Sequence, residues 1–188
     1  ESANGMPLLT LKFAIKQKNI GELGLSYMGG VYNTFQNNGI MLDEKRRCDV
    51  FAVDYNTKIE KTNTFITAEW AWINVQVPDN YTQQYGNKQL GGFIDIVQTI
   101  LKRKIAGWNN ASINIACRLE YVDWNVGKFT STGGHISEDI WSIVPAISFR
   151  PTTQTVLRLN YRHQQQQDIL GNPPANTGGF SFGVSTYF

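Results

Sequence analysis

The fold of this chain is decided by the stretch Ile113-Asn114-Ile115-Ala116-Cys117-Arg118-Leu119-Glu120-Tyr121. Its larger apolar residues alternate strictly with smaller or polar ones, so successive side chains would point to opposite faces of a β-strand. One face would carry isoleucine, cysteine, leucine and tyrosine, and the other asparagine, arginine and glutamate. The stretch therefore predicts a strand with one apolar face and one wet face.

The same alternation recurs along the chain. It is found in residues 9–16, 23–31, 51–56, 66–72, 141–149, 157–162 and 180–188. The chain carries 17% charged and 12% aromatic residues, a composition that suits alternating strands joined by polar loops. No apolar run is long enough for a membrane-spanning helix.

Residues 92–103 fit two patterns, because Phe93, Ile96, Val97, Ile100 and Leu101 also form a helical stripe. The connections between the segments decide in favour of a strand. Short turns near residues 18–19, 58–63, 106–110 and 150–153 alternate with long loops at 33–47, 78–91, 123–137 and 164–177. A helix at 92–103 would start the next strand on the wrong side of the sheet. The sequence thus predicts an all-β chain of about nine antiparallel strands.

Two architectures accommodate such strands, a soluble β-sandwich and a transmembrane up-and-down β-barrel. Short turns at one end and long loops at the other are typical of membrane barrels. Several strands also reach the length of about ten residues that a tilted strand needs to cross a bilayer. Aromatic residues near strand ends suit the girdles of a barrel. These are Tyr27, Tyr121, Trp124, Trp141, Phe149, Tyr161 and Phe188. We therefore expect residues 1–188 to form one membrane β-barrel domain.

The last residues, Phe180-Ser181-Phe182-Gly183-Val184-Ser185-Thr186-Tyr187-Phe188, end on phenylalanine with mostly apolar residues at alternate positions. This segment resembles the C-terminal assembly signal of Gram-negative outer-membrane proteins. The expected signal residues are Phe180, Phe182, Val184, Tyr187 and Phe188. The resemblance implies recognition by the barrel assembly machinery and residence in the outer membrane. Loops would then be extracellular, and turns and C-terminus periplasmic.

Two further stretches, Arg118-Leu119-Glu120-Tyr121-Val122-Asp123-Trp124-Asn125 and Ile147-Ser148-Phe149-Arg150-Pro151-Thr152-Thr153-Gln154, resemble the C-terminal part of porins. The family they resemble most is that of the phosphate-selective porins O and P. The resemblance covers residues 90–188 well and the first half loosely. It implies a diffusion channel, with anion selectivity in some members.

The odd number of predicted strands bears on whether they make up a whole barrel. With the C-terminus in the periplasm, nine strands place residue 1 on the extracellular side, whereas single-chain bacterial barrels have an even strand number. An open sheet would also leave two edges unpaired in lipid. We therefore expect further strands from another chain or from an N-terminal part, in a barrel of about 14–18 strands. The alternative is a complete barrel of eight strands.

The expected inward face is basic. Its predicted pore-lining residues are Lys12, Lys16, Glu69, Arg118, Glu120, Arg150, Arg158 and Arg162. With Asp54 added, six cations face three carboxylates, and a basic lumen attracts small anions. We therefore predict passive diffusion of small, anionic solutes. The alternative is a non-conducting barrel in a homo-oligomer or larger envelope assembly, contacting its partners through residues 81–89 and 164–167.

Other functions are disfavoured. His135 and His163 are not spaced with a nucleophile, so no enzyme is expected. Cys48 and Cys117 are expected to be unpaired thiols without a metal site, and no cofactor is expected. The net charge of +2 argues against nucleic-acid binding. Pro145 lies in a predicted strand and predicts a bulge or a gap in its ladder.

Overall fold

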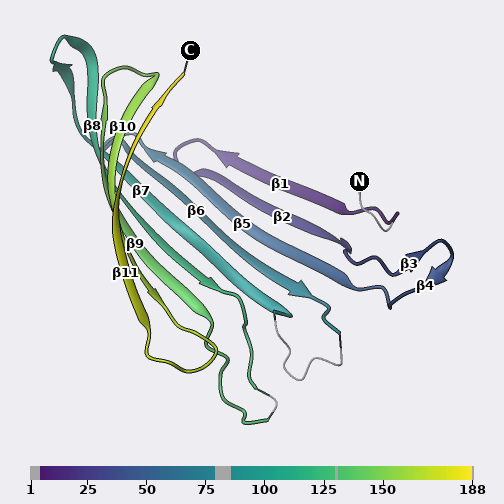
Figure 1. Cartoon of the computed structure of the whole chain (residues 1–188). Helices are drawn as coiled ribbons and strands as arrows, with labels where there is room; N and C mark the ends of the chain where they lie inside the picture. Colours follow the sequence, from purple (N-terminus) through teal and green to yellow (C-terminus); the bar gives the residue numbers. More distant parts are fainter. Residues whose placement is uncertain (1–4, 79–85, 130, 188) are drawn as a thin grey trace.

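The computed structural model describes residues 5–78, 86–129 and 131–187 and contains one large antiparallel sheet (Figure 1). Nine strands form it in the order β1-β2-β5-β6-β7-β8-β9-β10-β11. Their bounds are β1 Leu9–Gln17, β2 Gly21–Val31, β5 Arg47–Ile59, β6 Thr64–Val75, β7 Lys88–Ile105, β8 Trp108–Asp123, β9 Asp139–Arg150, β10 Thr155–Gln166 and β11 Ala175–Thr186. Each strand lies beside its neighbours in the chain. The predictions of an all-β, up-and-down antiparallel chain and of a strand at residues 92–103 are confirmed.

Among the described residues, no helix is long and apolar enough to cross a membrane.

The sheet is curved but open. The outer strands β1 and β11 each pair on one side, and no ladder joins them (Figure 1). The chain exposes 13014 Å², whereas a compact monomer of this mass would expose about 9,000 Å². The described residues therefore do not form a closed eight-stranded barrel, and that alternative is wrong.

Tight turns with left-handed residues join the strands at one end of the sheet. Asn19 and Asn63 adopt φ values of 72° and 51°. Ala106 and Gly107, at φ 47° and 93°, link β7 to β8 in the two-residue turn that fits the right-handed twist of a hairpin. After Arg150, the Thr152 hydroxyl accepts a hydrogen bond of 3.1 Å from the amide of Thr155.

The long loops contain more structure than their composition predicted. Residues 33–47 include a small hairpin of β3 (Gln36–Asn37) and β4 (Ile40–Met41), turned by Asn38 and Gly39 at φ 48° and 81°. That Asn-Gly pair is the sequence signal of such a hairpin. Residues 164–166 also belong to β10, so the prediction of a loop there is wrong.

Pro145 leaves a gap and no bulge. The β9–β10 ladder pairs Asn160 with Ala146 and His163 with Ile143, but forms no pairs between them. The register is unchanged across the gap, so no residue is inserted. Because proline has no amide hydrogen, the ladder is interrupted where the sequence predicted.

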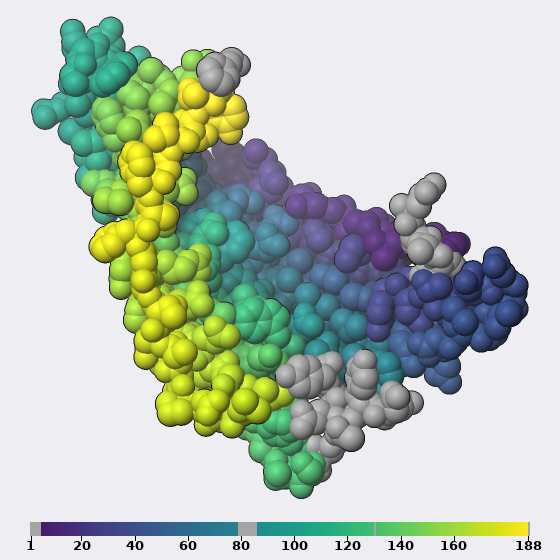
Figure 2. Space-filling model, viewed as in Figure 1, coloured from purple at the N-terminus to yellow at the C-terminus, as the bar shows by residue number. Residues whose placement is uncertain are grey.

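The sheet has one apolar and one polar face. Large side chains on the apolar face, such as Phe51, Ile115 and Leu159, are 44 to 46% exposed. On the polar face Ser142 is 1% and Asn114 6% exposed. Side chains converge on the inside of a curved sheet and splay on its outside. The polar face is therefore the concave one, whose hollow is visible in Figure 2.

Candidate pore-lining face

All eight residues predicted to line a pore lie on the concave face. Strand register fixes this arrangement, since directly paired residues share a face. The pairs include Lys16 with Glu22 and Asp54 with Glu69, while Arg118 pairs with Asp95. The full set on this face is Lys12, Lys16, Glu69, Arg118, Glu120, Arg150, Arg158 and Arg162. Their role in lining a pore stays a prediction.

At the β1 edge, Lys12 reaches across β2 to Asp54 on β5, with 3.0 Å between Nζ and Oδ1. Gly24 on β2 makes this contact sterically feasible. A Cβ atom at Gly24 would lie 2.3 Å from Oδ1 of Asp54. Nζ of Lys16 lies 3.8 Å from Oε2 of Glu22 on the neighbouring strand β2. Both lysines of β1 are thus matched by carboxylates.

A connected network of charges spans β7 to β10. The Arg118 guanidinium donates to both carboxylate oxygens of Asp95, and the distance from Nε to Oδ1 is 2.8 Å. The same guanidinium lies over the Phe93 ring, 4.3 Å from its centroid. Arg118 also lies 3.4 Å from Glu120. Arg162 donates to both oxygens of Glu120, at 2.5 and 3.2 Å, across the intervening strand β9.

The centre of this network is buried. The Ser142 hydroxyl donates to Glu120 over 2.7 Å and accepts from Arg162 over 3.0 Å. Charge-assisted hydrogen bonds of this kind are stronger than neutral ones, and here they join three strands side by side. Arg118 and Arg162 are thus neutralised locally by carboxylates of the same face.

Three cations on the concave face lack such partners. Lys102 on β7 and Arg150 on β9 both lie beside Ser112 of β8, and Arg158 lies beside Ser148. Within the described ranges, none of Lys102, Arg150 and Arg158 forms an ion pair. Register puts Arg158 diagonally opposite Arg150, about 7–8 Å apart between Cα atoms. These residues form an uncompensated basic cluster near the short-turn end.

The sequence missed Asp95 and Glu22 as carboxylates of this face, and it missed Lys102 as a cation. Asp95 and Glu22 follow the period-two rule, whereas Lys102 lies on this face only because of a register shift. Asp95 lay in the segment whose helical and strand patterns competed, and Lys102 follows a register shift between Thr99 and Leu101. The charge balance of the face is therefore closer to neutral than predicted, and its positive charge is concentrated locally.

The convex face carries an apolar band edged by aromatic rings. Near the long loops, Phe51 stacks on Trp72 with 5.8 Å between ring centroids, and Trp70 stacks on Tyr121 with 6.2 Å between ring centroids. Near the short turns, Trp108 packs edge-on against Phe149 at 6.0 Å. The nine residues from 141 to 149 span about 27 Å along β9. Tilted by about 40°, they give a band of about 20 Å, close to that of outer-membrane barrels.

Of two aromatic residues predicted near strand ends, Tyr161 differs from the prediction and Trp141 agrees with it. Tyr161 lies in the middle of β10, where its ring contacts Phe180 at 4.8 Å, so its prediction as a strand-end residue is wrong. Trp141 is at the expected end, and its indole nitrogen donates to Gln165 over 2.5 Å.

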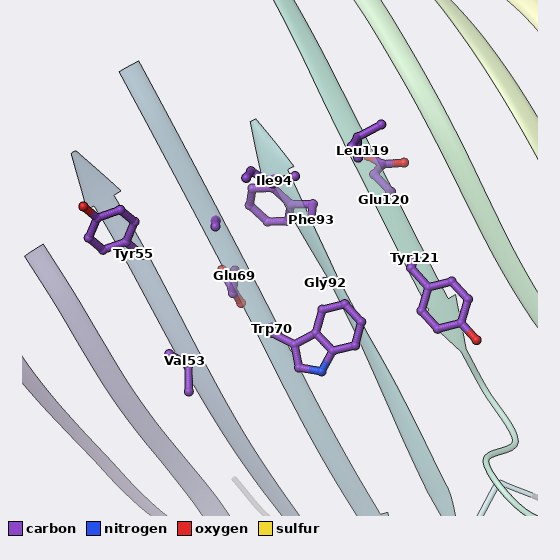
Figure 3. A pocket seen from close by; sticks show the side chains of 11 residues that line it. Val53, Tyr55, Glu69, Trp70, Gly92, Phe93, Ile94, Leu119, Glu120 and Tyr121 are labelled. Carbon is purple, nitrogen blue, oxygen red and sulfur yellow. The ribbon is translucent and has the colours of Figure 1, made fainter. Parts of the chain in front are cut away.

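The band contains a shallow apolar hollow of about 390 Å³ (Figure 3). Small residues form part of its floor, because Ala68 and Gly92 lie diagonally across β6 and β7, opposite the larger Ile94 and Trp70. Its walls are held in place, since the Tyr55 hydroxyl donates to the carbonyl of Ile20 over 2.6 Å and Trp70 stacks on Tyr121.

The residues of the expected assembly signal lie on the last strand. Phe180, Phe182 and Val184 are paired with Tyr161, Leu159 and Leu157 on the apolar face, and the three are 61 to 78% exposed. Tyr187 follows β11, and its amide donates to the carbonyl of Gln154 over 3.1 Å. Phe188 lies outside the described residues, as do residues 81–85 of the expected contact loop.

The long loop after β2 is ordered by one carboxylate. Asp43 accepts hydrogen bonds from Arg46 at 2.8 and 3.0 Å, from the amide of Glu44 at 2.8 Å and from Asn33 at 3.3 Å. The Arg46 guanidinium, followed by the Glu44 amide, holds the pKa of Asp43 below its ordinary value.

This geometry predicts a pH response of the loop. A carboxylate whose folded pKa is depressed stabilises the fold above its unfolded pKa, and that contribution is lost as pH falls through the folded pKa. We expect the NMR shifts of the Arg46 amide and of the Asn33 side-chain amide to titrate with a midpoint below about 3.9, the pKa of an unperturbed aspartate. Asp43→Asn should abolish the titration. A midpoint at or above 3.9 in the unaltered protein would contradict the assignment.

Known proteins give no independent information about this face. No family model, curated protein or solved structure was found to match this chain. Within the described ranges, no three metal-binding side chains gather as a metal site, and both cysteines are free thiols.

Proposed function

We propose that this chain forms part of the wall of an outer-membrane, porin-like channel for passive diffusion of small anionic solutes. The observation that carries the proposal is the two-faced sheet. An apolar convex band with aromatic edges suits lipid, and a polar concave face suits a water-filled lumen. Further strands, from another chain or an N-terminal part, would close the sheet and pair the free edges of β1 and β11.

The basic cluster of Lys102, Arg150 and Arg158 supports a preference for anions. Charges already paired with carboxylates contribute little to the field in a lumen, whereas uncompensated guanidiniums attract and concentrate anions. Arginine also offers parallel donors that match carboxylate and phosphate oxygens. Selectivity would therefore depend on a few residues near the short turns, and not on every cation of the concave face.

Reversal potentials in planar bilayers, measured across a KCl gradient with the protein purified from outer membranes, test this proposal. The unaltered channel should prefer chloride to potassium. In the double variant Arg150→Gln/Arg158→Gln, the permeability ratio should fall about threefold, because the local field is removed.

The control variant Lys18→Gln/Lys61→Gln removes the same charge from turns outside the concave face, and it should leave the ratio nearly unchanged. Cation preference in the unaltered channel would refute the proposal. Equal shifts in both double variants would refute the role of Arg150 and Arg158.

A non-conducting structural barrel is the second candidate. The observation that favours it is the network of Asp95, Arg118, Glu120 and Arg162, which fills part of the concave face and ties strands together. The same bilayers decide between the two, since a structural barrel would insert without conducting.

A further inference from the structure

The hairpin of β7 and β8 projects beyond the rest of the sheet. Gln98 pairs with Thr64, the first residue of β6, and Ser112 pairs with Arg150, the last residue of β9. Residues 99–111 therefore form the projecting end of this hairpin, here called the ribbon and visible at the upper left of Figure 1. Residues 103–111 pair only with each other, whereas Thr99, Leu101 and Lys102 pair with residues 112–114 of β8. The ribbon extends about 20 Å past β6 and about 13 Å past β9. The other short connections are tight turns.

The ribbon is purely cationic. Lys102, Arg103 and Lys104 are consecutive, so they charge both of its faces, and all three are exposed. No aspartate or glutamate occurs between Asp95 and Glu120 in the sequence. None of the three cations forms an ion pair with any residue that the structure describes.

The outer edges of the ribbon are also unpaired. From Ile100 onward β7 has no ladder partner on its β6 side, and residues 108–111 of β8 have none on their β9 side. Free strand edges are templates for another strand, and lysines on an edge can serve to repel one. If Lys102, Arg103 and Lys104 served only to block strand addition, they would oppose partners of any charge. Because no acidic residue lies near them, they instead favour a partner strand that carries acidic side chains.

The surrounding rim strengthens this charge. At the short-turn end, Lys18, Lys61 and Arg150 add to the ribbon's cations, whereas Glu22 and Glu60 are already paired with Lys16 and Lys58. The loop end, in contrast, is closer to charge balance. Its described acids are Asp43, Glu44, Asp49, Asp123, Glu138, Asp139 and Asp168, and its cations are Lys45, Arg46, Arg47, Lys88 and Lys128. A negatively charged partner would therefore be steered to the end from which the ribbon projects.

We propose that the ribbon of residues 99–111 docks an extended acidic segment of a partner protein, which adds a strand to one of its free edges. Backbone hydrogen bonds would hold the segment, and Lys102, Arg103 and Lys104 would select its acidic side chains. Lys102 also belongs to the basic cluster of the concave face, but Arg103 and Lys104, on which the test rests, do not, so the inference does not depend on conduction.

Fluorescence anisotropy tests the proposal with the whole protein in detergent micelles. The probe is a labelled peptide of about twelve residues in which glutamate alternates with threonine. The matched probe repeats glutamate–glutamate–proline–proline, which carries the same charge but removes every second ladder donor from both of its edges. We expect the threonine peptide to bind at least tenfold more tightly than the proline peptide.

Variants assign the site. Arg103→Gln/Lys104→Gln should weaken binding of the threonine peptide at least fivefold, whereas Lys88→Gln/Lys128→Gln, at the loop end of the sheet, should change it less than twofold. Equal affinity of the two peptides would overturn strand addition. Equal effects of the two variants would overturn the ribbon as the site. If phosphatidylglycerol vesicles bind the protein and displace the threonine peptide, the ribbon is a lipid-headgroup surface and the proposal fails.

Discussion

Replacing Gly92 by valine is expected to lower the free energy of unfolding by about 3 kcal/mol, the upper range for overpacking a well-packed site. Gly92 lies between Trp70 and Tyr121 on adjacent strands. A Cβ atom there would lie 2.2 Å from the carbonyl oxygen of Glu69 and 2.6 Å from the Trp70 ring. The backbone atom cannot move without breaking the ladder, and the ring would lose its stack on Tyr121.

Urea unfolding in detergent micelles, followed by tryptophan fluorescence, measures the effect. Gly179→Val is the matched control, because a Cβ atom at Gly179 on β11 would meet nothing within 4 Å apart from its chain neighbours, and valine suits a strand. Its free energy of unfolding should change by less than about 0.5 kcal/mol. Equal destabilisation by both substitutions would mean that Gly92 is not specifically constrained.

Replacing Glu120 by alanine is expected to cost about 2–3 kcal/mol of unfolding free energy, as for a buried polar network that loses its shared acceptor. Glu120 accepts from Ser142, Arg118 and Arg162. Without it, the Ser142 hydroxyl loses its acceptor while 1% exposed, and the Arg162 guanidinium loses its ion pair.

Glu69→Ala is the control for this prediction. Glu69 lies on the same face but forms no ion pair within the described part of the chain, so its removal should cost less than about 0.5 kcal/mol. The same urea titrations apply. If both variants unfold alike, the network around Glu120 contributes no more than an exposed charge does.

Much of the fold follows from the sequence because side-chain direction in a strand has a period of two. The stretch from Ile113 to Tyr121 needs no tertiary information to be recognised as a strand. Residues 92–103 did need it, since their apolar spacing fits a helix equally well and the alternation of turns decided between them. The β3–β4 hairpin was missed because two-residue strands carry no periodic signal.

The site was less predictable than the fold. Sequence alternation assigns a residue to a face, but ion pairs depend on which residues lie opposite across one or two strands. Arg162 and Glu120 are 42 positions apart and meet across β9. Register shifts in β7, which put Lys102 beside Ser112, have no signature in a single sequence. The sequence therefore predicted many of the charges on the concave face, but it missed Asp95, Glu22 and Lys102 and did not show which charges are neutralised.

The unequal charges of the two ends of the concave face have an electrical consequence for a conducting barrel. The uncompensated cations Lys102, Arg150 and Arg158 lie near the short turns, whereas the loop end is closer to charge balance, so an anion entering from one end meets attraction first and from the other end meets it last. Its energy profile along the pore is then asymmetric. Such a channel would rectify, passing more anion current at one sign of the applied voltage than at the other, and its orientation in a bilayer could be read from the current–voltage curve.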